Sequence, residues 1–375
     1  MEEWKEYKLG DVCSRLRSGK SIKADFIFNT GKYPVIGGNG VRGYADESNF
    51  VGQAAVIGRQ GAYCGNVRFF EGEAYMTEHA VVAVGNEHAD TRFLACLLSL
   101  MHLGNLSAQS AQPGISVQTL SKQLVRLPSI SYQKRVSAII KSLDDKIEVN
   151  RRINDNLEQQ AQALFKSWFV DFEPFKDREF IDTEMGIIPE GWKVGTLYDV
   201  AEIYDRLRKP LSGKDRENMK RTYPYYGATS CMDFVDNYIF DGIYTLIGED
   251  GSVVKDNGLP YMQYVWGKFW VNNHAHILQG KNGYSTEMIH VLLSITNIQH
   301  LVTGAVQAKL SQANMQKILL AIPPSNILDE FRPIIGCMYE MRRKNEDESA
   351  RLTHLRDSLL PKLMSGELKA DEINL

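Results

Sequence analysis

Apolar residues recur at alternating spacings of four and three along two long segments of the chain. The first seam consists of Val136, Ile140, Leu143, Ile147, Asn150, Asn154, Leu157, Ala161, Leu164 and Trp168. The second consists of Phe331, Ile335, Met338, Arg342, Asn345, Ser349, Leu352, Arg356, Leu359 and Leu363. This spacing predicts two long coiled-coil helices. Ser131 and Asn326 are good N-cap types at matching places, so we expect spacer helices over 131–175 and 326–368.

Both seams become polar at their centres, where Asn150 and Asn345 occupy equivalent positions. If the two helices pair antiparallel, these centres meet, and a buried Asn layer fixes the register at some loss of stability. The alternative is that the central stretch is simply exposed to solvent, because Arg342 and Arg356 fit poorly into a dry seam.

A mixed segment precedes each predicted helix. Short β-like runs alternate with Gly- and Asn-rich turns, and an apolar helical stretch follows them. In the first segment these elements are Ala54–Gly58, Asn66–Phe70, His79–Val84 and Asp90–Leu103. In the second they are Ile243–Gly248, His274–Leu278 and Thr286–Ile298. Each segment therefore reads as a small α+β globule.

The order of these patterns is repeated, because residues 4–169 match residues 192–364 at a nearly constant offset. Trp4 matches Trp192, and Ile57-Gly58 matches Ile247-Gly248. The duplication predicts an α+β protein with two pseudo-two-fold-related globular domains joined by two long antiparallel helices. Duplex DNA is the commonest two-fold ligand of such proteins. The predicted domain plan is 1–130, 131–175, 176–191, 192–325 and 326–368.

The predicted helices would act as a ruler between the two globules. A helix of about 38 residues is roughly 57 Å long. This is up to about one and a half turns of B-DNA. The duplication therefore suggests two readers separated by a spacer of defined length.

Composition narrows the class further. The net charge of −3 argues against a heavily basic nucleic-acid binder, although basic residues can still gather on one face. Five scattered cysteines form no CxxC pair, which favours a reducing compartment without disulfides or structural zinc. The first residues lack an apolar signal region, and no apolar run is long enough to span a bilayer. We therefore expect a cytoplasmic protein with no membrane association.

Three segments resemble a known family, the specificity subunits of type I restriction–modification systems. They are Gln162–Pro174 (QALFKSWFVDFEP), Gly186–Trp192 (GIIPEGW) and Leu359–Leu368 (LLPKLMSGEL). Together with the repeat, the resemblance covers nearly the whole chain. The family often has a Glu-Gln pair at the helix starts, where this chain has Tyr132-Gln133 and Leu328-Asp329. This departure concerns capping detail.

The resemblance implies that each globule is a target-recognition domain for one half of a split double-stranded DNA sequence. The long helices would set the unread gap and bind two methyltransferase subunits, which carry S-adenosylmethionine. Restriction/translocase subunits that use ATP and magnesium would complete an adenine-N6 methyltransferase and ATP-dependent endonuclease. The resemblance also implies that this subunit has no active site and no cofactor of its own.

Motif searches are consistent with that expectation. The only Pro-Pro pair, Pro323-Pro324, has no aromatic residue after it, so the segment that holds a flipped adenine is missing. No GxxxxGK[ST] phosphate loop is present. Residues Gly38–Gly43 match GxGxxG, but the second copy lacks these glycines, so we expect a turn-rich loop. A stand-alone DNA-binding regulator, or an enzyme that itself cuts or methylates DNA, remains the alternative function.

Two further patterns have a chemical and a structural interpretation. Glu249-Asp250 with Lys255 suggests a metal-dependent nuclease site, but the matching place in the first copy is Arg59-Gln60. Such variation is typical of two domains that recognise different DNA sequences. His79 and His274 are equivalent and flanked by apolar residues, so we expect core histidines and no metal site.

Candidate DNA contacts are the Arg, Lys, Asn, Gln and small polar residues of the loops, for which plain surface exposure is the alternative. In the first copy they are Lys20, Asn39, Arg42, Arg59, Gln60, Tyr63 and Arg68. In the second they are Lys214, Arg216, Thr229, Ser230, Lys255, Asn257, Gln263, Asn272 and Asn273. Candidates for phosphate contact are Gln112, Ser116, Gln307 and Ser311.

Two assignments stay open. Glu249 and Asp250 are potential acceptors for a cytosine amino group. The aromatic run of Trp168, Phe169, Phe172 and Phe175 is either core against the second globule or a surface for the methyltransferase subunit.

Overall fold

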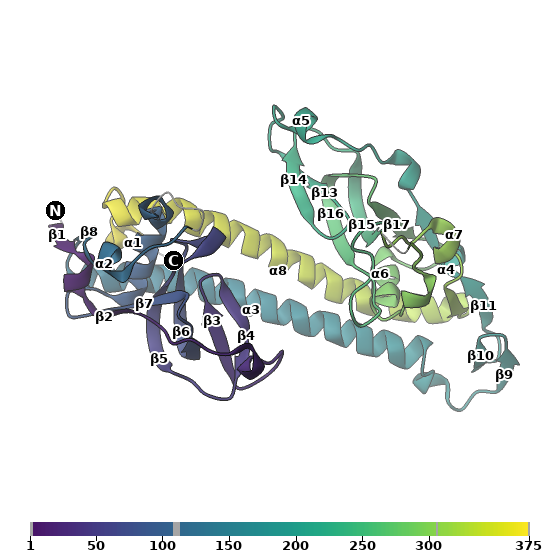
Figure 1. The fold of residues 1–375 in the computed structure, drawn as a ribbon. Helices are drawn as coiled ribbons and strands as arrows, with labels where there is room; N and C mark the ends of the chain where they lie inside the picture. The colour runs from purple at the N-terminus through teal and green to yellow at the C-terminus, as the bar shows by residue number, and fades with distance from the viewer. Residues whose placement is uncertain (1–2, 108–112, 305–306, 374–375) are drawn as a thin grey trace. The chain divides into compact units, whose positions relative to one another are not determined.

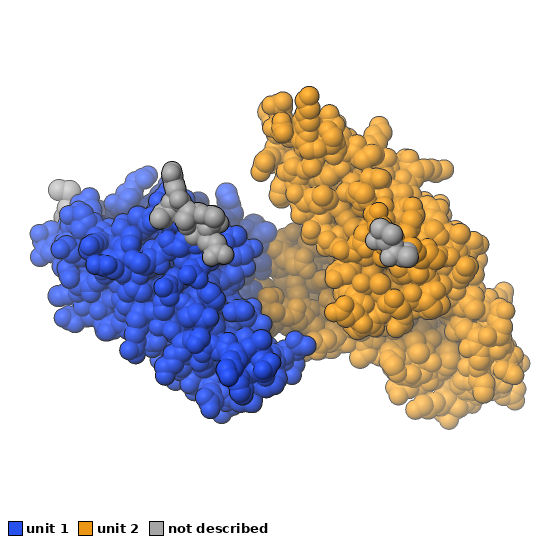
Figure 2. All heavy atoms as spheres, in the orientation of Figure 1, with its two compact units in different colours: residues 1–149, 348–375 blue, residues 150–347 orange. Residues whose placement is uncertain are grey.

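The computed structural model describes residues 3–107, 113–304 and 307–373, and the chain divides into two compact units. Unit 1 comprises Met1–Val149 and Glu348–Leu375, and unit 2 comprises Asn150–Asp347 (Figure 2). Two long helices, α3 (Ile130–Phe169) and α8 (Ser325–Ser365), each contribute one half to each unit. The predicted domain plan, in which each helix stood apart from the globules, therefore differs from the division that the contacts give.

Both long helices end earlier than the sequence pattern indicated. Helix α3 stops at Phe169, ahead of the predicted end at 175, because Phe172 takes a left-handed backbone conformation with φ of 53°. A separate 3-10 turn, Glu173–Phe175, follows. Helix α8 stops at Ser365, and Gly366 then takes a φ of 76°, the glycine conformation common after helix ends.

Each unit contains a six-stranded mixed sheet, and the two sheets have the same strand order. The order is β2-β7-β5-β6-β3-β4 in unit 1 and β12-β17-β15-β16-β13-β14 in unit 2 (Figure 1). Neighbours pair antiparallel except for β3 with β6 and β13 with β16, which are parallel. The strands of the first sheet are β2 (Cys13–Ser18), β3 (Tyr33–Gly37), β4 (Gly40–Ala45), β5 (Phe50–Gly58), β6 (Val67–Met76) and β7 (Ala80–Gly85). Those of the second are β12 (Ala201–Ile203), β13 (Tyr223–Tyr226), β14 (Cys231–Val235), β15 (Phe240–Gly248), β16 (Met262–Val271) and β17 (Ala275–Gly280).

Smaller elements complete the units. Two-stranded ladders join the ends of each globule, and a hairpin follows α3. Their strands are β1 (Lys5–Lys8), β8 (Leu124–Leu127), β11 (Lys193–Thr196), β18 (Leu319–Ile322), β9 (Phe180–Thr183) and β10 (Gly186–Pro189). The short helices are α1 (Thr91–Leu100), α2 (Val117–Ser121), α4 (Leu197–Val200), α5 (Gly213–Arg216), α6 (Thr286–Ser294) and α7 (Gln312–Met315). The prediction of two related α+β globules with two long helices is confirmed.

Alternation along the strands explains why both faces of each sheet are buried. Along β5, Ala55 and Ile57 pack into the main core of unit 1, which includes α1 and α3. Their neighbours Ala54 and Val56 belong to a second apolar cluster. Successive side chains of a strand point to opposite faces, so one apolar run supplies both clusters.

The long helices pair antiparallel within each unit, as predicted. In unit 1, Asp144 of α3 contacts Arg356 of α8 at 2.9 Å. In unit 2, Phe165 of α3 stacks edge-on against Phe331 of α8, with ring centroids 5.9 Å apart. The outer seam residues, such as Val136 and Phe331, are fully buried, so the apolar repeat marks the packed face.

The polar centre of the seam is buried, which excludes the solvent-exposed alternative. Asn150 is 1% exposed, and its side-chain amide donates to the carbonyl oxygen of Asn345 at 3.3 Å. Asn345 in turn donates to Asn154 Oδ1 at 2.8 Å. The two seam arginines are accommodated by carboxylates, because Arg342 pairs with Glu158 at 3.2 Å and Arg356 pairs with Asp144.

The aromatic run after α3 is core of unit 2. Phe169, Phe172 and Phe175 are each less than 10% exposed and pack around Trp192. In unit 1 the segment after α8 plays the same part, because the Tyr132 hydroxyl donates to the carbonyl of Leu368 at 3.0 Å. Of the two interpretations of this run, the structure supports the core assignment.

Across the described ranges, none of the helices combines the length and the apolar character that crossing a bilayer requires.

Candidate nucleic-acid interface

Most of the first-copy candidates gather at one end of the unit 1 sheet, which we call tip 1. Tip 1 comprises the β3–β4 turn, the β5–β6 connection and the β6–β7 turn. The Arg68 guanidinium donates to Asn39 Oδ1 at 3.1 Å, and the Arg59 amide donates to the His79 carbonyl at 2.9 Å. A Cβ on Gly38 would lie 3.2 Å from the Gly58 Cα, so the turns are in close contact. Segments far apart in sequence therefore present their polar side chains together.

Tip 1 is rich in cationic side chains that the protein leaves without carboxylate partners. Arg42 and Arg68 are exposed, and Arg59 is half-buried with its guanidinium 3.5 Å from Ser18 Oγ. Within residues 3–107 and the other described ranges, none of these three arginines has a carboxylate at ion-pair distance. Lys20, Gln60 and Tyr63 are also exposed, and the Lys20 amide donates to Met76 beside the same turn. Unpaired guanidinium groups are well suited to phosphates and to guanine edges.

The corresponding end of unit 2, tip 2, is formed by the equivalent turns, although its β15–β16 connection (249–261) is five residues longer than the β5–β6 connection (59–66), and its side chains differ. The Glu249 amide donates to the His274 carbonyl at 2.8 Å, as Arg59 does to His79. Gln263, at the place of Arg68, donates to the Gly227 carbonyl at 2.8 Å. Thr229, Ser230 and Asn273 are exposed in the surrounding turns.

Other second-copy candidates lie elsewhere or already have structural contacts. Lys214 is exposed on α5, whereas Arg216 pairs with Asp233 and its guanidinium lies above the Tyr225 ring. Lys255 and Asn257 are exposed on the β15–β16 connection, where Asn257 Oδ1 accepts from the Leu259 amide.

Asn272 is a correction to the sequence-based set. It is only 4% exposed, and its Oδ1 accepts from the His274 amide at 2.8 Å. Its side chain therefore shapes the β16–β17 turn from inside and presents no polar group to a ligand. The sequence pattern gave no sign of this burial, because Asn is common both in turns and at DNA contacts.

The paired serines cap short helices. Ser116 Oγ accepts from the Thr119 amide at 2.9 Å, and Ser311 Oγ accepts from the Asn314 amide at 3.2 Å. Gln307 is exposed, and Gln112 lies outside the described residues. A hydroxyl that caps a helix still has its proton to donate, so a phosphate contact stays a prediction for both serines.

The expectation that His79 and His274 are core histidines is wrong. Their side chains are 42% and 46% exposed, because both sit in the turn before β7 or β17. In unit 2, His276, two residues further on at an inward position of β17, is buried, as is His290 of α6. The alternation of the strand begins after the turn, so its inward histidine is His276 and not His274.

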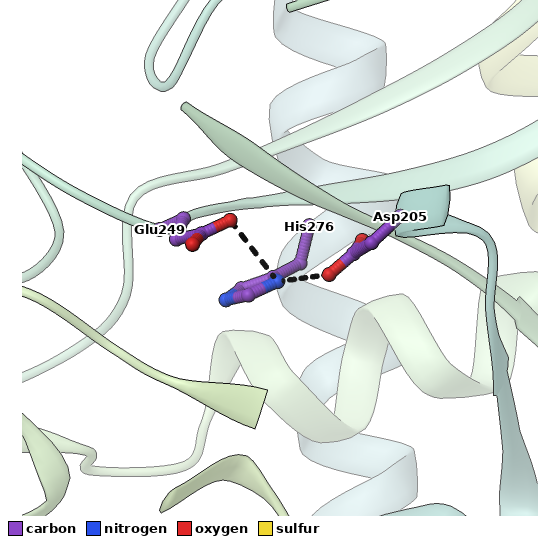
Figure 3. Close-up of side chains that lie close together, drawn as sticks. All are labelled: Asp205, Glu249 and His276. Carbon is purple, nitrogen blue, oxygen red and sulfur yellow. Dashed lines mark hydrogen bonds and ion pairs between the residues drawn. The ribbon is translucent and has the colours of Figure 1, made fainter. Parts of the chain in front are cut away.

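His276 forms a buried cluster with Asp205 and Glu249 that sequence reasoning missed (Figure 3). Its Nδ1 lies 2.5 Å from Asp205 Oδ2 and 3.7 Å from Glu249 Oε2. Its Nε2 lies 2.7 Å from the Leu310 carbonyl oxygen. A carbonyl only accepts, so the ring donates from Nε2 there, while its Nδ1 faces the Asp205 carboxylate. The ring therefore lies between two carboxylates and a backbone carbonyl.

These ligand types suit a divalent metal, but the surrounding side chains fill the place of one. Arg208 Nη1 lies 2.5 Å from Glu249 Oε2, and Gln312 donates to Asp205 Oδ2 at 2.5 Å. Arg208, which also lies 3.6 Å from Asp205 Oδ2, and Lys309, 3.4 Å from Glu249 Oε1, therefore already supply positive charge to the two carboxylates. Glu249 is engaged inside the protein, which argues against the idea that it accepts from a cytosine amino group.

Burial alone would raise the pKa of the Asp205 carboxyl, but its contacts reverse that effect. The hydrogen bond and positive charge of His276, with hydrogen bonds from Gln312 and the Ile277 amide, lower the pKa below its ordinary value. In unit 1 the matching positions hold Ser18, Arg59 and Val81, so the cluster belongs to unit 2 alone. The missed signal was a polar residue at an inward position of an apolar strand.

Replacing His276 with Val, the residue type of unit 1, is expected to destabilise unit 2 by about 3–5 kcal/mol, because the buried Asp205 carboxylate loses its contact with the ring. Urea unfolding together with hydrogen exchange of β17 measures this loss. The matched control is His274→Ala, whose exposed pair with Asp250 is expected to contribute only about 0–1 kcal/mol. Equal losses in the two variants would contradict the structural role of the buried His276 contact.

The stabilising effect of Asp205 is expected to depend on pH with a definite sign. Its folded-state pKa lies below the ordinary 3.8, so its contribution is complete above that pH and is lost as pH falls through the lowered pKa. The stability difference between the natural chain and Asp205→Asn should stay constant from about pH 7 to pH 5 and shrink below the ordinary pKa. Unfolding midpoints measured across this range test the sign, and a difference that grew on acidification would refute it.

Comparison with known proteins places the chain in a family. The model of the type I restriction modification DNA specificity domain matches residues 1–159 and 189–330. The chain therefore belongs to the family of type I restriction–modification specificity subunits, as the three sequence segments indicated. The two matches fall on the two copies of the repeat.

Particular relatives support this placement. The chain is 28% identical over 296 residues to the MjaIX specificity subunit of Methanocaldococcus jannaschii, covering 72% of this chain and 67% of that protein. It is 24% identical over 489 residues to the HindI specificity subunit of Haemophilus influenzae, covering 98% of this chain and 100% of the relative. The crystal structure of the S subunit from M. genitalium has the same fold, with a TM-score of 0.58, 17% identity and 96% of each chain covered.

Proposed function

We propose that the chain reads the two halves of a bipartite double-stranded DNA target, one half with tip 1 and the other with tip 2. The observation that supports this most is that equivalent positions in two sheets of the same strand order carry different side chains. Arg59 and Arg68 of tip 1 stand where tip 2 has Glu249 and Gln263. A shared catalytic site would retain its chemistry in both copies, whereas two readers of different sequences need different side chains on one scaffold.

The chain has a non-catalytic role in this proposal. The long helices carry two methyltransferase subunits, which supply S-adenosylmethionine, and restriction/translocase subunits join with ATP and magnesium. The assembled complex then methylates adenine at N6 and cleaves DNA that lacks the mark. Exposed apolar residues on the helices, including Val149, Ile153 and Met341, are suited to partner binding.

The test is a single-molecule methylome of cells that express this chain with the methyltransferase encoded beside it. A new split motif with methyladenine in both halves, absent without this chain, is the expected result. Its sequence would at the same time identify the target and the unread gap.

Two outcomes would count against the proposal. Absence of a new motif, with the methyltransferase shown to be bound, would remove the specificity role. Tight, salt-resistant binding of the isolated chain to DNA would instead favour a stand-alone regulator, because a subunit of a larger complex is expected to bind weakly by itself.

A further inference from the structure

The two globules carry opposite charges at the same structural position, on the helix that packs against the sheet. Arg92 is the second residue of α1, and Glu287 is the second residue of α6. Both side chains are buried, with exposures of 9% and 7%. A buried charge requires a partner, and each of these residues has one on a long helix; Arg92 also lies 3.5 Å from Glu71 Oε2 on β6 of its own globule.

In unit 1 the globule contributes the positive residue of this ion pair, and the long helix contributes the negative residue. Arg92 Nη1 lies 3.3 Å from Asp144 Oδ2 on α3, and its guanidinium lies 3.8 Å from the centre of the Phe69 ring. Asp144 is held in place from the other side by Arg356 of α8. The ion pair therefore fastens the globule to the helix pair.

In unit 2 the charges of the ion pair are reversed, because the globule contributes the negative residue and the long helix contributes the positive one. Glu287 Oε1 accepts from Arg343 Nη1 on α8 at 3.0 Å and from the Tyr264 hydroxyl at 2.9 Å. Tyr264 occupies the position that Phe69 has in unit 1. The Phe69 ring has no polar group, whereas the Tyr264 hydroxyl donates a hydrogen bond to Glu287. The neighbouring Arg342 joins α8 to α3 through Glu158.

Exchange of the globules would bring like charges together. Arg92 would then face the part of α8 that carries Arg343, and Glu287 would face the part of α3 that carries Asp144 and Glu148. Desolvated like charges at contact distance are strongly unfavourable, whereas both native pairings are complementary. Other contacts do not make this distinction so clearly, because the two copies share their backbone and most of their apolar pattern.

We infer that Arg92–Asp144 and Glu287–Arg343 form a reciprocal pairing code that lets each globule dock only on the helix segment that follows it in the chain. The code depends on the duplication and not on what the tips bind. It implies that a globule can be moved from one repeat to the other only together with the charged helix residue that pairs with it, Asp144 for the first globule or Arg343 for the second. The code thereby determines which globule, with its tip, docks on α3 and which docks on α8.

A charge swap in the full-length chain tests the ion pair in unit 2, where it is simplest. Glu287→Arg is expected to lower the unfolding temperature of unit 2 by roughly 10 °C, because the introduced guanidinium would face that of Arg343 in a buried site. The double variant Glu287→Arg/Arg343→Glu should recover more than half of that loss. The neutral Glu287→Gln should fall between the natural chain and the single reversal. Failure of the double variant to recover stability would overturn the code, since a purely space-filling role does not depend on sign.

A globule exchange tests the pairing rule itself. In the full-length chain, Lys193–Ile322 is replaced by Lys5–Leu127, so that the unit 1 globule meets α8. This chimera should be poorly soluble with Arg343 in place and markedly more stable with Arg343→Asp, as judged by thermal unfolding and size-exclusion chromatography. Two chimeras of equal stability would overturn the rule, whereas rescue by the single helix residue supports it.

Discussion

The double variant Arg59→Ala/Arg68→Gln is expected to lose recognition of one half of the target and to keep recognition of the other. Arginine is the commonest reader of guanine, and each two-hydrogen-bond contact contributes about 1–3 kcal/mol of discrimination. Loss of both contacts should therefore reduce methylation of the natural site by roughly 30-fold or more. Gln at position 68 is the residue that tip 2 uses at the same place, so the backbone tolerates it.

The measurement is a methylome of cells that carry the variant with its methyltransferase, followed by rates on a panel of single-base changes in vitro. The half-site assigned to unit 1 should become degenerate at one or two positions, at least one of them guanine. The half-site assigned to unit 2 should remain unchanged, because tip 2 is untouched.

A matched control uses an arginine far from the tips in the same unit. Arg126 is exposed on β8, and Arg126→Ala removes one positive charge, half of what the double variant removes, without touching tip 1. If Arg126→Ala lowered methylation as much as the double variant does, the loss in the double variant would reflect the reduced positive charge of unit 1 and not specific base contacts. An unchanged motif at natural rates in the double variant would remove Arg59 and Arg68 from recognition.

The periodic features of the chain were predictable because they depend on residue spacing alone. The seam through Val136 and Phe331, the buried Asn layer and the two α+β globules all follow from repeated patterns. Packing selects the same face of a helix that the apolar repeat marks, so sequence and structure agree there. The shared strand order of the two sheets also follows from the repeat.

The predictions from sequence failed at positions where tertiary contacts determine the environment of a polar residue. Asn272 and His274 are neighbours in one turn, yet one is buried and the other exposed. His276 was overlooked because its partners, Asp205 and Glu249, come from distant parts of the chain. The apolar pattern of β17 marks His276 as a polar residue at a buried position, but no local pattern indicates which distant residues face it. The end of α3 was also placed too late, because the aromatic run continues the apolar pattern beyond the helix.

Removal of one heptad from each long helix is expected to shorten the unread gap of the target and to leave both half-sites intact. Helices α3 and α8 are continuous segments that pass from one unit into the other. Seven residues correspond to about 10 Å of helix, or roughly three base pairs of B-DNA. A deletion of two turns changes the rotation between the flanking segments by only about 20°.

The deletion is designed to spare the ion pairs that fasten the globules. Residues 146–152 of α3 and 344–350 of α8 lie between Asp144 and Glu158 on one helix and between Arg343 and Arg356 on the other. Lys146 pairs with Glu348, and Asn150 contacts Asn345, so the two deleted segments face each other. The remaining seam keeps its heptad phase, and Asn154, which donates to the Arg342 carbonyl at 3.1 Å, remains from the polar layer to hold the antiparallel register.

The methylome of the deletion variant measures the gap and the bases in one experiment. A motif with the same two halves and a gap about three base pairs shorter is the expected outcome. The control removes seven residues from α3 alone, which breaks the register between the helices and should abolish methylation. An unchanged gap would show that the helices do not set the spacing. Altered bases in either half would mean that recognition depends on the helices themselves, contrary to the assignment of reading to the tips.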